Sequence, residues 1–154
     1  MQEKSLFIES SVSTEQLAEQ IGCNLRGGEC IELVSDLGGG KTTFTRGLVR
    51  GVGSLDNVSS PTFTIGKQYK AGDITCYHFD FYRLDQPGLV AEELAEALGD
   101  PRGIMIVEWA DSVAEVLPVD RLIINFQKVA DDSESRKITI KYPDKFTYVF
   151  QGVK

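Results

Sequence analysis

The chain has 154 residues, which leaves room for one compact domain over residues 1–154 and excludes a large multidomain machine. Hydrophobic residues make up 42% and charged residues 25%, as in an average folded domain, so disorder and fibrous repeats are excluded as well. Sixteen basic and 23 acidic side chains give a formal net charge of −7, which disfavours direct binding to a nucleic-acid backbone.

The N-terminus and the cysteines favour a cytoplasmic protein. The opening residues, MQEKSLFIES, lack the basic region and the apolar stretch of about 7–15 residues that a secretion signal requires. Apolar runs such as residues 104–107 are far shorter than the ~20 residues that cross a bilayer. The three cysteines, Cys23, Cys30 and Cys76, form no C-x-x-C pair, so neither a disulfide framework nor a zinc site is indicated.

The first half of the chain alternates strands with helices. A short strand is predicted at residues 6–8, and the helix after it opens with a capping box at residues 13–16 and ends at Gly27-Gly28. A buried strand is predicted at residues 30–34 (CIELV). A glycine-rich turn connects it to a second amphipathic helix, whose apolar face carries Phe44, Leu48 and Val52. The order of a strand, a glycine-rich loop and a helix is the most informative feature of this half of the chain.

A hairpin follows the second helix and a polar stretch at residues 54–60. Its turn is predicted at residues 71–73, and the strand after it, residues 74–81, alternates its side chains cleanly. Because side chains alternate across a strand, His78 and Asp80 point to the same face.

The remainder of the chain predicts one more helix, at residues 87–99, and three strands. The strand at residues 103–107 is wholly apolar, which is typical of a central strand that is covered on both faces. Glu108 follows it, and therefore stands at a carboxyl edge, where open α/β sheets bind ligands. The last two strands, residues 121–127 and 136–142, are expected to pair. Strands that alternate with helices in this way indicate an α/β fold.

The strongest motif is SDLGGGKT at residues 35–42. It matches the phosphate-loop pattern G-x-x-x-x-G-K-[ST] at every fixed position except the first, where Ser35 replaces glycine. The glycines at residues 38–40 let backbone N–H groups approach a polyphosphate, and the following helix adds its positive dipole end. Lys41 can place an ammonium on the β- and γ-phosphates, and Thr42 can give its hydroxyl to Mg²⁺. The alternative is a flexible turn before an ordinary helix, but the flanking strand and helix favour a nucleotide site.

Asp80 and Glu108 are candidate ligands for that Mg²⁺, because each stands near the end of a predicted strand. Taken alone, Asp80 fits a cap and Glu108 a surface acid equally well, but beside a phosphate loop the metal role is favoured. Glu108 also fits a second role, in which its carboxylate orients or deprotonates an attacking water. The sequence leaves both roles open.

Four other residues give weaker signals. Thr62, in a polar loop, can meet the γ-phosphate or the metal, and Arg83 can offset charge that develops during phosphoryl transfer. His78 is the only histidine and fits a packed core residue better than a general base. Trp109 either walls the site or faces a partner, with core packing as the default interpretation.

Four motifs together resemble the TsaE family of small ATPases, which act in bacterial tRNA threonylcarbamoyladenosine synthesis. They are SDLGGGKTTFTRG at residues 35–47, SSPTFTI at 59–65, YHFDFYRL at 77–84 and IVEWAD at 106–111, in the order and at the spacing of the family. The resemblance covers nearly the whole chain. It departs from the family pattern at Ser35 and over residues 85–98.

By this resemblance, residues 1–154 form a single P-loop ATPase domain, a three-layer sandwich whose central mixed sheet carries helices on both faces. Its cofactors would be ATP and Mg²⁺. The nucleotide-binding residues that the resemblance implies are Ser13, Thr14, Asp36, Leu37, Gly38, Gly39, Gly40, Lys41, Thr42, Thr43, Thr62 and Arg83. The implied metal ligands are Thr42, Asp80 and Glu108, and the implied catalytic residues are Lys41, Asp80 and Glu108.

The resemblance also implies two protein partners, TsaB and TsaD, with tRNA reached only through them and no membrane. Nucleotide binding or hydrolysis would change residues 54–64 and so alter docking on a partner, and hydrolysis would be slow without partners. The chain itself would not transfer the carbamoyl group. Two rival interpretations stay open: a small-molecule kinase with the same phosphate loop, and a non-catalytic interaction module that uses nucleotide only for stability. The seven arginines are scattered singly, which argues against a kinase lid.

Overall fold

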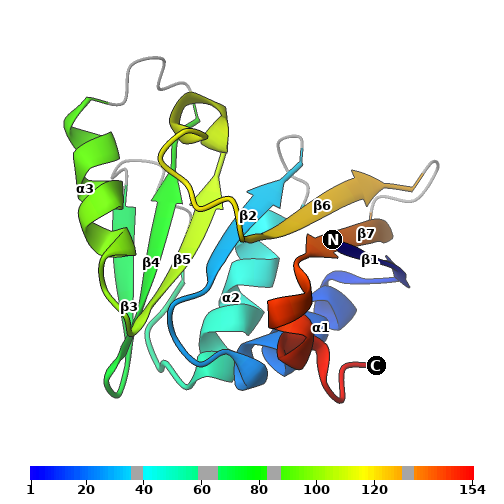
Figure 1. The fold of residues 1–154 in the computed structure, drawn as a ribbon. Coiled ribbons are helices and arrows are strands. Elements are labelled where there is room, and N and C mark those ends of the chain that lie inside the picture. The colour runs from blue at the N-terminus through cyan, green and yellow to red at the C-terminus, as the bar shows by residue number, and fades with distance from the viewer. Residues whose placement is uncertain (36–39, 59–65, 83–87, 130–133) are drawn as a thin grey trace.

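A mixed β-sheet with helices packed on it forms the framework of the chain (Figure 1). The computed structural model describes residues 1–35, 40–58, 66–82, 88–129 and 134–154. Within those ranges, one seven-stranded sheet has the order β1-β7-β6-β2-β5-β4-β3. The elements are, in chain order, β1 (Gln2–Ile8), α1 (Ser11–Asn24), β2 (Cys30–Val34), α2 (Lys41–Val52), β3 (Gly66–Ala71), β4 (Ile74–Asp80), α3 (Leu89–Leu98), β5 (Gly103–Glu108), η1 (Ala110–Val113), β6 (Leu122–Lys128), β7 (Arg136–Tyr142) and η2 (Asp144–Phe150).

The strands in the middle of the sheet run parallel. β2 pairs with β5 and with β6, and β4 pairs with β5, all in parallel register. β1, β3 and β7 add antiparallel pairs at the two flanks. The predicted mixed sheet is therefore confirmed, as is the pairing of the last two strands. Because parallel strands end together, the carboxyl ends of β2, β4, β5 and β6 lie at the same edge of the sheet.

Alternation along β5 explains why the fold has three layers. Ile104 and Ile106 pack into one hydrophobic core with α1 and α2, while Met105 and Val107 pack into a second core with α3. All six residues of β5 are buried, as predicted for a central strand. Helices therefore cover both faces of the sheet, which confirms the predicted α/β sandwich (Figure 1).

Glycines bring α1 and α2 into close contact. A Cβ atom added to Gly47 would lie 2.1 Å from the carbonyl oxygen of Glu15, and one added to Gly51 would lie 2.2 Å from that of Glu19. Because both contacts advance by four residues, the two helices run in the same direction. The first turns of α1 and α2 are therefore at the same edge of the sheet.

Several elements differ from the predictions. Ser10 caps α1, since its Oγ accepts a hydrogen bond from the Ser13 backbone N–H at 3.2 Å, so residues 13–16 lie inside the helix and the predicted capping box is wrong. β1 begins at Gln2 because it pairs with β7 along its whole length. The 3₁₀ helix η2 was not predicted, because its buried residues Phe146, Val149 and Phe150 show a helical spacing over only seven residues, which is shorter than the window that such a pattern needs.

The three cysteines are free thiols in different surroundings. Cys23 is exposed, whereas Cys30 and Cys76 are buried. Burial in apolar surroundings raises the pKa of Cys30 and of Cys76 to about 12, because it disfavours the charged thiolate. The two buried thiols are thus part of the core.

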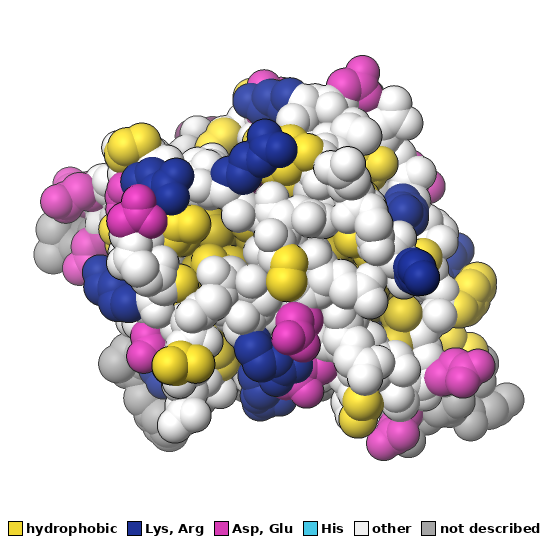
Figure 2. Space-filling view, turned by 90° about the horizontal axis from the view of Figure 1, so that it is seen from below, with side chains coloured by type: hydrophobic (Ala, Val, Ile, Leu, Met, Phe, Trp, Pro, Cys, Tyr) yellow, Lys and Arg dark blue, Asp and Glu magenta, His cyan; other side chains and the backbone are white. Residues whose placement is uncertain are grey.

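Two further observations concern membranes and surface charge. None of the helices in the described ranges combines the length and the apolar composition needed to span a bilayer. On the face shown in Figure 2, the Lys and Arg side chains that are coloured lie beside Asp and Glu side chains and do not gather into one broad basic area.

Candidate functional site

The predicted phosphate loop, residues 35–42, connects the end of β2 to the start of α2. Residues 36–39 of the loop lie outside the described residues. Gly40 caps α2 with a φ of 104°, a left-handed conformation that glycine adopts without strain. Its carbonyl oxygen accepts a helical hydrogen bond from the Phe44 N–H at 2.9 Å. A strand, a glycine-containing loop and a helix therefore follow one another as predicted.

Lys41 is held between the ends of β2 and β5. Only 7% of the residue is exposed, and Nζ donates a hydrogen bond to the Ser35 carbonyl oxygen at 3.2 Å. Nζ also lies 4.3 Å from the centroid of the Trp109 ring, a cation–π contact. Trp109 directly follows β5 and has a φ of 55°, which is strained for a bulky residue. Such strain is concentrated at functional sites, because the surrounding structure must maintain it.

The two candidate carboxylates stand side by side. Asp80 ends β4 and Glu108 ends β5, and the two residues are partners in the parallel register. Glu108 is only 3% exposed, and its Oε2 lies 2.5 Å from Nε2 of His78, which is fully buried. Asp80 is half-buried, and its Oδ1 accepts a hydrogen bond from the Tyr82 N–H at 2.9 Å. The prediction that Asp80 and Glu108 stand at the same edge of the sheet is therefore confirmed.

The electrostatics of Asp80 show that these groups act on one another. Burial raises the pKa of the Asp80 carboxyl, and the negative charge of Glu108 adds to that rise, whereas the Tyr82 N–H, His78 and Lys41 oppose it. A divalent cation beside the two carboxylates would relieve their repulsion, and oxygen ligands suit Mg²⁺. No group of three or more His, Cys, Asp or Glu side chains in the described ranges could hold a metal. A cation here would need phosphate or water as further ligands.

The other predicted nucleotide-binding residues are described only in part. Thr42 and Thr43 are half-buried on the first turn of α2. Ser13 and Thr14 lie in α1 at the same edge of the sheet, where Thr14 is buried and its hydroxyl donates a hydrogen bond to the Ser10 carbonyl oxygen at 3.2 Å. The predicted site residues that lie outside the described residues are Asp36, Leu37, Gly38, Gly39, Thr62 and Arg83.

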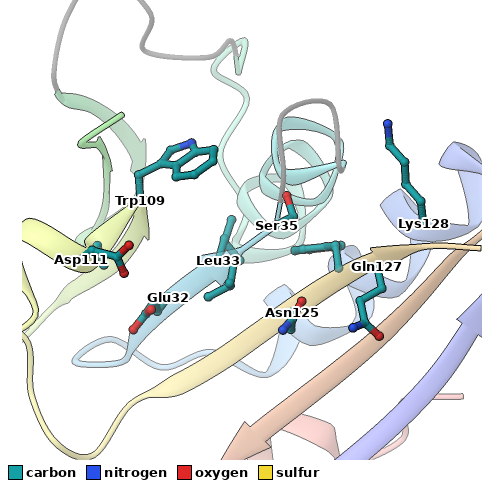
Figure 3. Close-up of a pocket in the computed structure, with 11 residues that line it drawn as sticks. Glu32, Leu33, Ser35, Trp109, Asp111, Asn125, Gln127 and Lys128 are labelled. Carbon is teal, nitrogen blue, oxygen red and sulfur yellow. The ribbon is translucent and has the colours of Figure 1, made fainter. Parts of the chain in front are cut away.

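A pocket of about 580 Å³ adjoins the loop (Figure 3). Trp109 and Asp111 flank it on the β5 side, Asn125 and Gln127 flank it from β6, and Ser35 stands at the end of β2 between them. The pocket therefore brings carboxylate, amide and aromatic groups next to the phosphate loop. Sequence analysis singled out only Ser35 and Trp109 among these residues, because the polar side chains of β6 carry no motif.

Two contacts at the site were not predicted from the sequence. His78 is fully buried, as predicted for a packed core residue, but its hydrogen bond to Glu108 was not predicted. The contact between Trp109 and Lys41 is the second one. The alternation along β4 placed His78 on the face of Asp80, which was the available signal. The contact with Glu108 depends on β4 lying next to β5, and a periodicity of two says nothing of strand order.

Known proteins resemble this chain in sequence. A family model described as threonylcarbamoyl adenosine biosynthesis protein TsaE matches residues 8–138. The tRNA threonylcarbamoyladenosine biosynthesis protein TsaE of Bacillus subtilis (strain 168) is 39% identical over 131 residues, which make up 82% of this chain and 77% of that protein. The protein of the same name from Rickettsia bellii (strain RML369-C) is 31% identical over 138 residues, or 88% of this chain and 94% of that protein.

A solved structure resembles it in fold. The crystal structure of Bacillus subtilis YdiB matches with a TM-score of 0.79 and 27% sequence identity, and the match covers 99% of this chain and 94% of that chain. The sequence similarity and the structural similarity to these proteins thus each cover most of the chain. The chain belongs to the TsaE family, and its biological role lies in tRNA threonylcarbamoyladenosine biosynthesis.

Proposed function

We propose that this chain binds ATP with Mg²⁺ at the phosphate loop and hydrolyses it, in the service of tRNA threonylcarbamoyladenosine synthesis. The observation that carries the proposal is the convergence of one buried ammonium, Lys41, with two buried or half-buried carboxylates, Asp80 and Glu108, at the carboxyl edge of a parallel sheet. An ammonium and a pair of carboxylates beside a phosphate loop suit a metal-bound polyphosphate.

Each residue has a distinct part in this proposal. The Lys41 ammonium neutralises charge on the β- and γ-phosphates, and residues 36–43 supply backbone N–H groups. Thr42, Asp80 and Glu108 would hold the Mg²⁺, directly or through water. When bound, Mg²⁺ neutralises the charge that develops on the phosphate oxygens. The carboxylate that is not a direct ligand orients the attacking water, since it lies within the same cluster.

The contact between Lys41 and the Trp109 ring offers a way to follow nucleotide binding. The Lys41 ammonium has three N–H donors, so it can keep its hydrogen bond to the Ser35 carbonyl oxygen and add one to a phosphate. The phosphate would compete with the Trp109 ring for the ammonium, so we expect nucleotide binding to shift the ring. Because Trp109 is the only tryptophan, its fluorescence would report on this shift without a label.

The proposal extends to partners through the same family membership. TsaB and TsaD are the proteins on which we expect the nucleotide state to act, through residues 54–64, and tRNA would be reached only through them. The net charge of −7 supports an indirect contact with tRNA, because phosphate neutralisation needs basic side chains. In this account the chain uses ATP to drive or reset a partner complex and leaves the carbamoyl transfer to that complex.

Phosphate release measured with ATP and Mg²⁺ tests the proposal. We expect slow turnover by the chain alone, faster turnover when TsaB and TsaD are added, and loss of both in Lys41→Ala. Lys145→Ala is the matched control, because Lys145 is exposed and its contacts in the described ranges, with Asp120 and the Phe146 ring, lie outside the candidate site. Turnover that stays absent with both partners would contradict the proposal.

The same assay separates the two rivals. A γ-phosphate label recovered on a small metabolite in place of free phosphate would indicate a kinase. A Glu108→Ala variant that folds and still supports the tRNA modification in cells would indicate a non-catalytic module, because that role does not need the carboxylate.

A further inference from the structure

His78 is buried against the candidate metal ligand and has no part in the proposal so far. It lies on β4 two residues before Asp80, and its register partner on β5, Ile106, lies two residues before Glu108. His78 is 0% exposed and Glu108 is 3% exposed, so water does not compete for the contact between them. The Nε2–Oε2 distance of 2.5 Å makes this a short hydrogen bond.

The partners of the ring determine where its hydrogen is. Nδ1 of His78 is buried and has no hydrogen-bond partner within the described part of the chain. A hydrogen on Nδ1 would therefore be a buried donor without an acceptor, which costs more than an unpaired lone pair. An ionised carboxylate only accepts hydrogen bonds, so the hydrogen belongs on Nε2, which donates it to Glu108.

The geometry points to His78 as the positioning residue that fixes the Glu108 carboxylate for a divalent cation. This inference rests on the proposed function. With Oε2 bound to His78, and with no second hydrogen bond to the Glu108 carboxylate within the described ranges, Oε1 is left for a cation or its water. Lys41 and Asp80 lie on the same side of the sheet, so the fixed carboxylate faces the cluster that would hold the phosphate.

The same geometry explains why a histidine is suited to this place. The side chain must reach across from β4 to the end of β5 and donate a single hydrogen bond from within the core. An apolar residue of similar size would fill the space but leave Glu108 free to rotate, and residues that hold a metal ligand in place typically contribute 10–100-fold to metal affinity.

Binding of ATP, measured by calorimetry with EDTA and then over a range of Mg²⁺ concentrations, tests the inference without relying on turnover. In His78→Leu we expect an unchanged affinity for ATP in EDTA, and about a 10–100-fold higher Mg²⁺ concentration for half of the Mg²⁺ effect. Cys76→Ala is the matched control, since Cys76 is equally buried, two residues earlier on the same face of β4. A folded His78→Leu with the Mg²⁺ dependence of the wild type would overturn the inference.

A second measurement keeps the inference testable if His78→Leu does not fold. The chain has one histidine, so a ¹H–¹⁵N spectrum of the wild-type imidazole needs no assignment. A hydrogen bound to Nε2 is the expected result, and a ring without one would overturn the inference because it cannot donate to Glu108. This spectrum reports on the contact whether or not ATP binds, whereas a wild type that ignores ATP and Mg²⁺ contradicts the proposed function itself.

Discussion

Two buried glutamates, Glu29 before β2 and Glu108 at the end of β5, have very different surroundings. Glu29 is 1% exposed, and its carboxylate accepts hydrogen bonds from the Arg26 and Gly27 backbone N–H groups at 2.8 and 2.9 Å and from the Tyr148 hydroxyl at 2.6 Å. The Arg26 guanidinium also stacks 4.0 Å from the Tyr148 ring. Glu108 is equally buried, yet within the described ranges its carboxylate has one hydrogen-bond partner, His78.

The difference separates a structural carboxylate from one that is available for chemistry. A buried charge is costly unless its hydrogen bonds are made, and three donors satisfy Glu29 within the protein. Glu29 thereby joins the α1–β2 connection to η2, which ties the C-terminal segment to the fold. Glu108 and its neighbour Asp80 lack comparable partners, and a cation would complete their coordination. The predictions below test this contrast.

The largest effect is expected at the carboxyl edge. Replacing Glu108 by Gln removes the charge but keeps the shape, so turnover of ATP should fall by about 100-fold, as when one preorganised electrostatic contact is lost. The free energy of unfolding should change little, because the amide still fits beside His78. Steady-state phosphate release and urea unfolding of the same preparation measure both quantities. A variant that hydrolyses ATP as fast as the wild type would contradict the functional role proposed for Glu108.

The opposite pattern is expected for Glu29→Gln. The amide keeps one oxygen and replaces the other with an NH₂ group, which would face the N–H of either Arg26 or Gly27, so we expect a loss of about 2 kcal/mol in the free energy of unfolding. Turnover per folded molecule should stay near that of the wild type, because Glu29 stands at the other end of β2. Urea unfolding monitored by circular dichroism gives the first quantity. An inactive but fully stable variant would show that Glu29 belongs to the functional cluster.

A smaller effect is expected for Tyr148→Phe, which removes one of the three donors to Glu29. The expected loss is about 1 kcal/mol. Burial, together with the hydrogen bond and charge of Glu29, raises the pKa of Tyr148. Since the unfolded tyrosine ionises near pH 10 while the folded one stays protonated, this contribution is complete below pH 10 and declines as the pH rises further. Unfolding at pH 8 and pH 11 should therefore show a smaller loss on mutation at the higher pH.

A further prediction concerns the two buried thiols, Cys30 and Cys76. The pKa of Cys30 and of Cys76 is about 12 in the folded chain, against about 9 when unfolded. Their contribution to stability is complete below pH 9 and is lost as the pH rises from 9 to 12, because only the unfolded thiols ionise there. At pH 8 a thiol reagent should modify Cys23 alone in the native state. Rapid native modification of Cys30 would contradict this burial.

Local sequence patterns predicted the strands and helices that position the site. They predicted the contacts between those elements less well. The run CIELV, the glycines and the helix after Lys41 all follow from residues next to one another, so β2, the loop and α2 could be predicted. The apolar run that ends in Glu108 was enough to predict β5. The cap of α1 was misplaced because the residues at 13–16 fit the capping-box pattern, whereas Ser10 has the extended backbone that a cap requires.

Contacts across the sheet were beyond the sequence patterns. His78 and Glu108 are 30 residues apart, and Glu29 and Tyr148 are 119 apart. The first contact depends on the order of the strands and the second on a short 3₁₀ helix at the other end of the chain, and local spacing specifies neither. The sequence predicted which residue types stand at the carboxyl edge. It did not predict which buried carboxylate has its hydrogen bonds made within the protein and which one is left to bind a ligand.

Calorimetric titration of ATP, with Mg²⁺ and with EDTA, into the wild type and Glu108→Gln is the most direct test of the central claim. We expect the wild type to bind ATP and to bind it more tightly with Mg²⁺, and the variant to bind ATP but to lose most of the Mg²⁺ effect. A wild type that gives no heat of binding, or a variant whose Mg²⁺ effect equals that of the wild type, would contradict the claim.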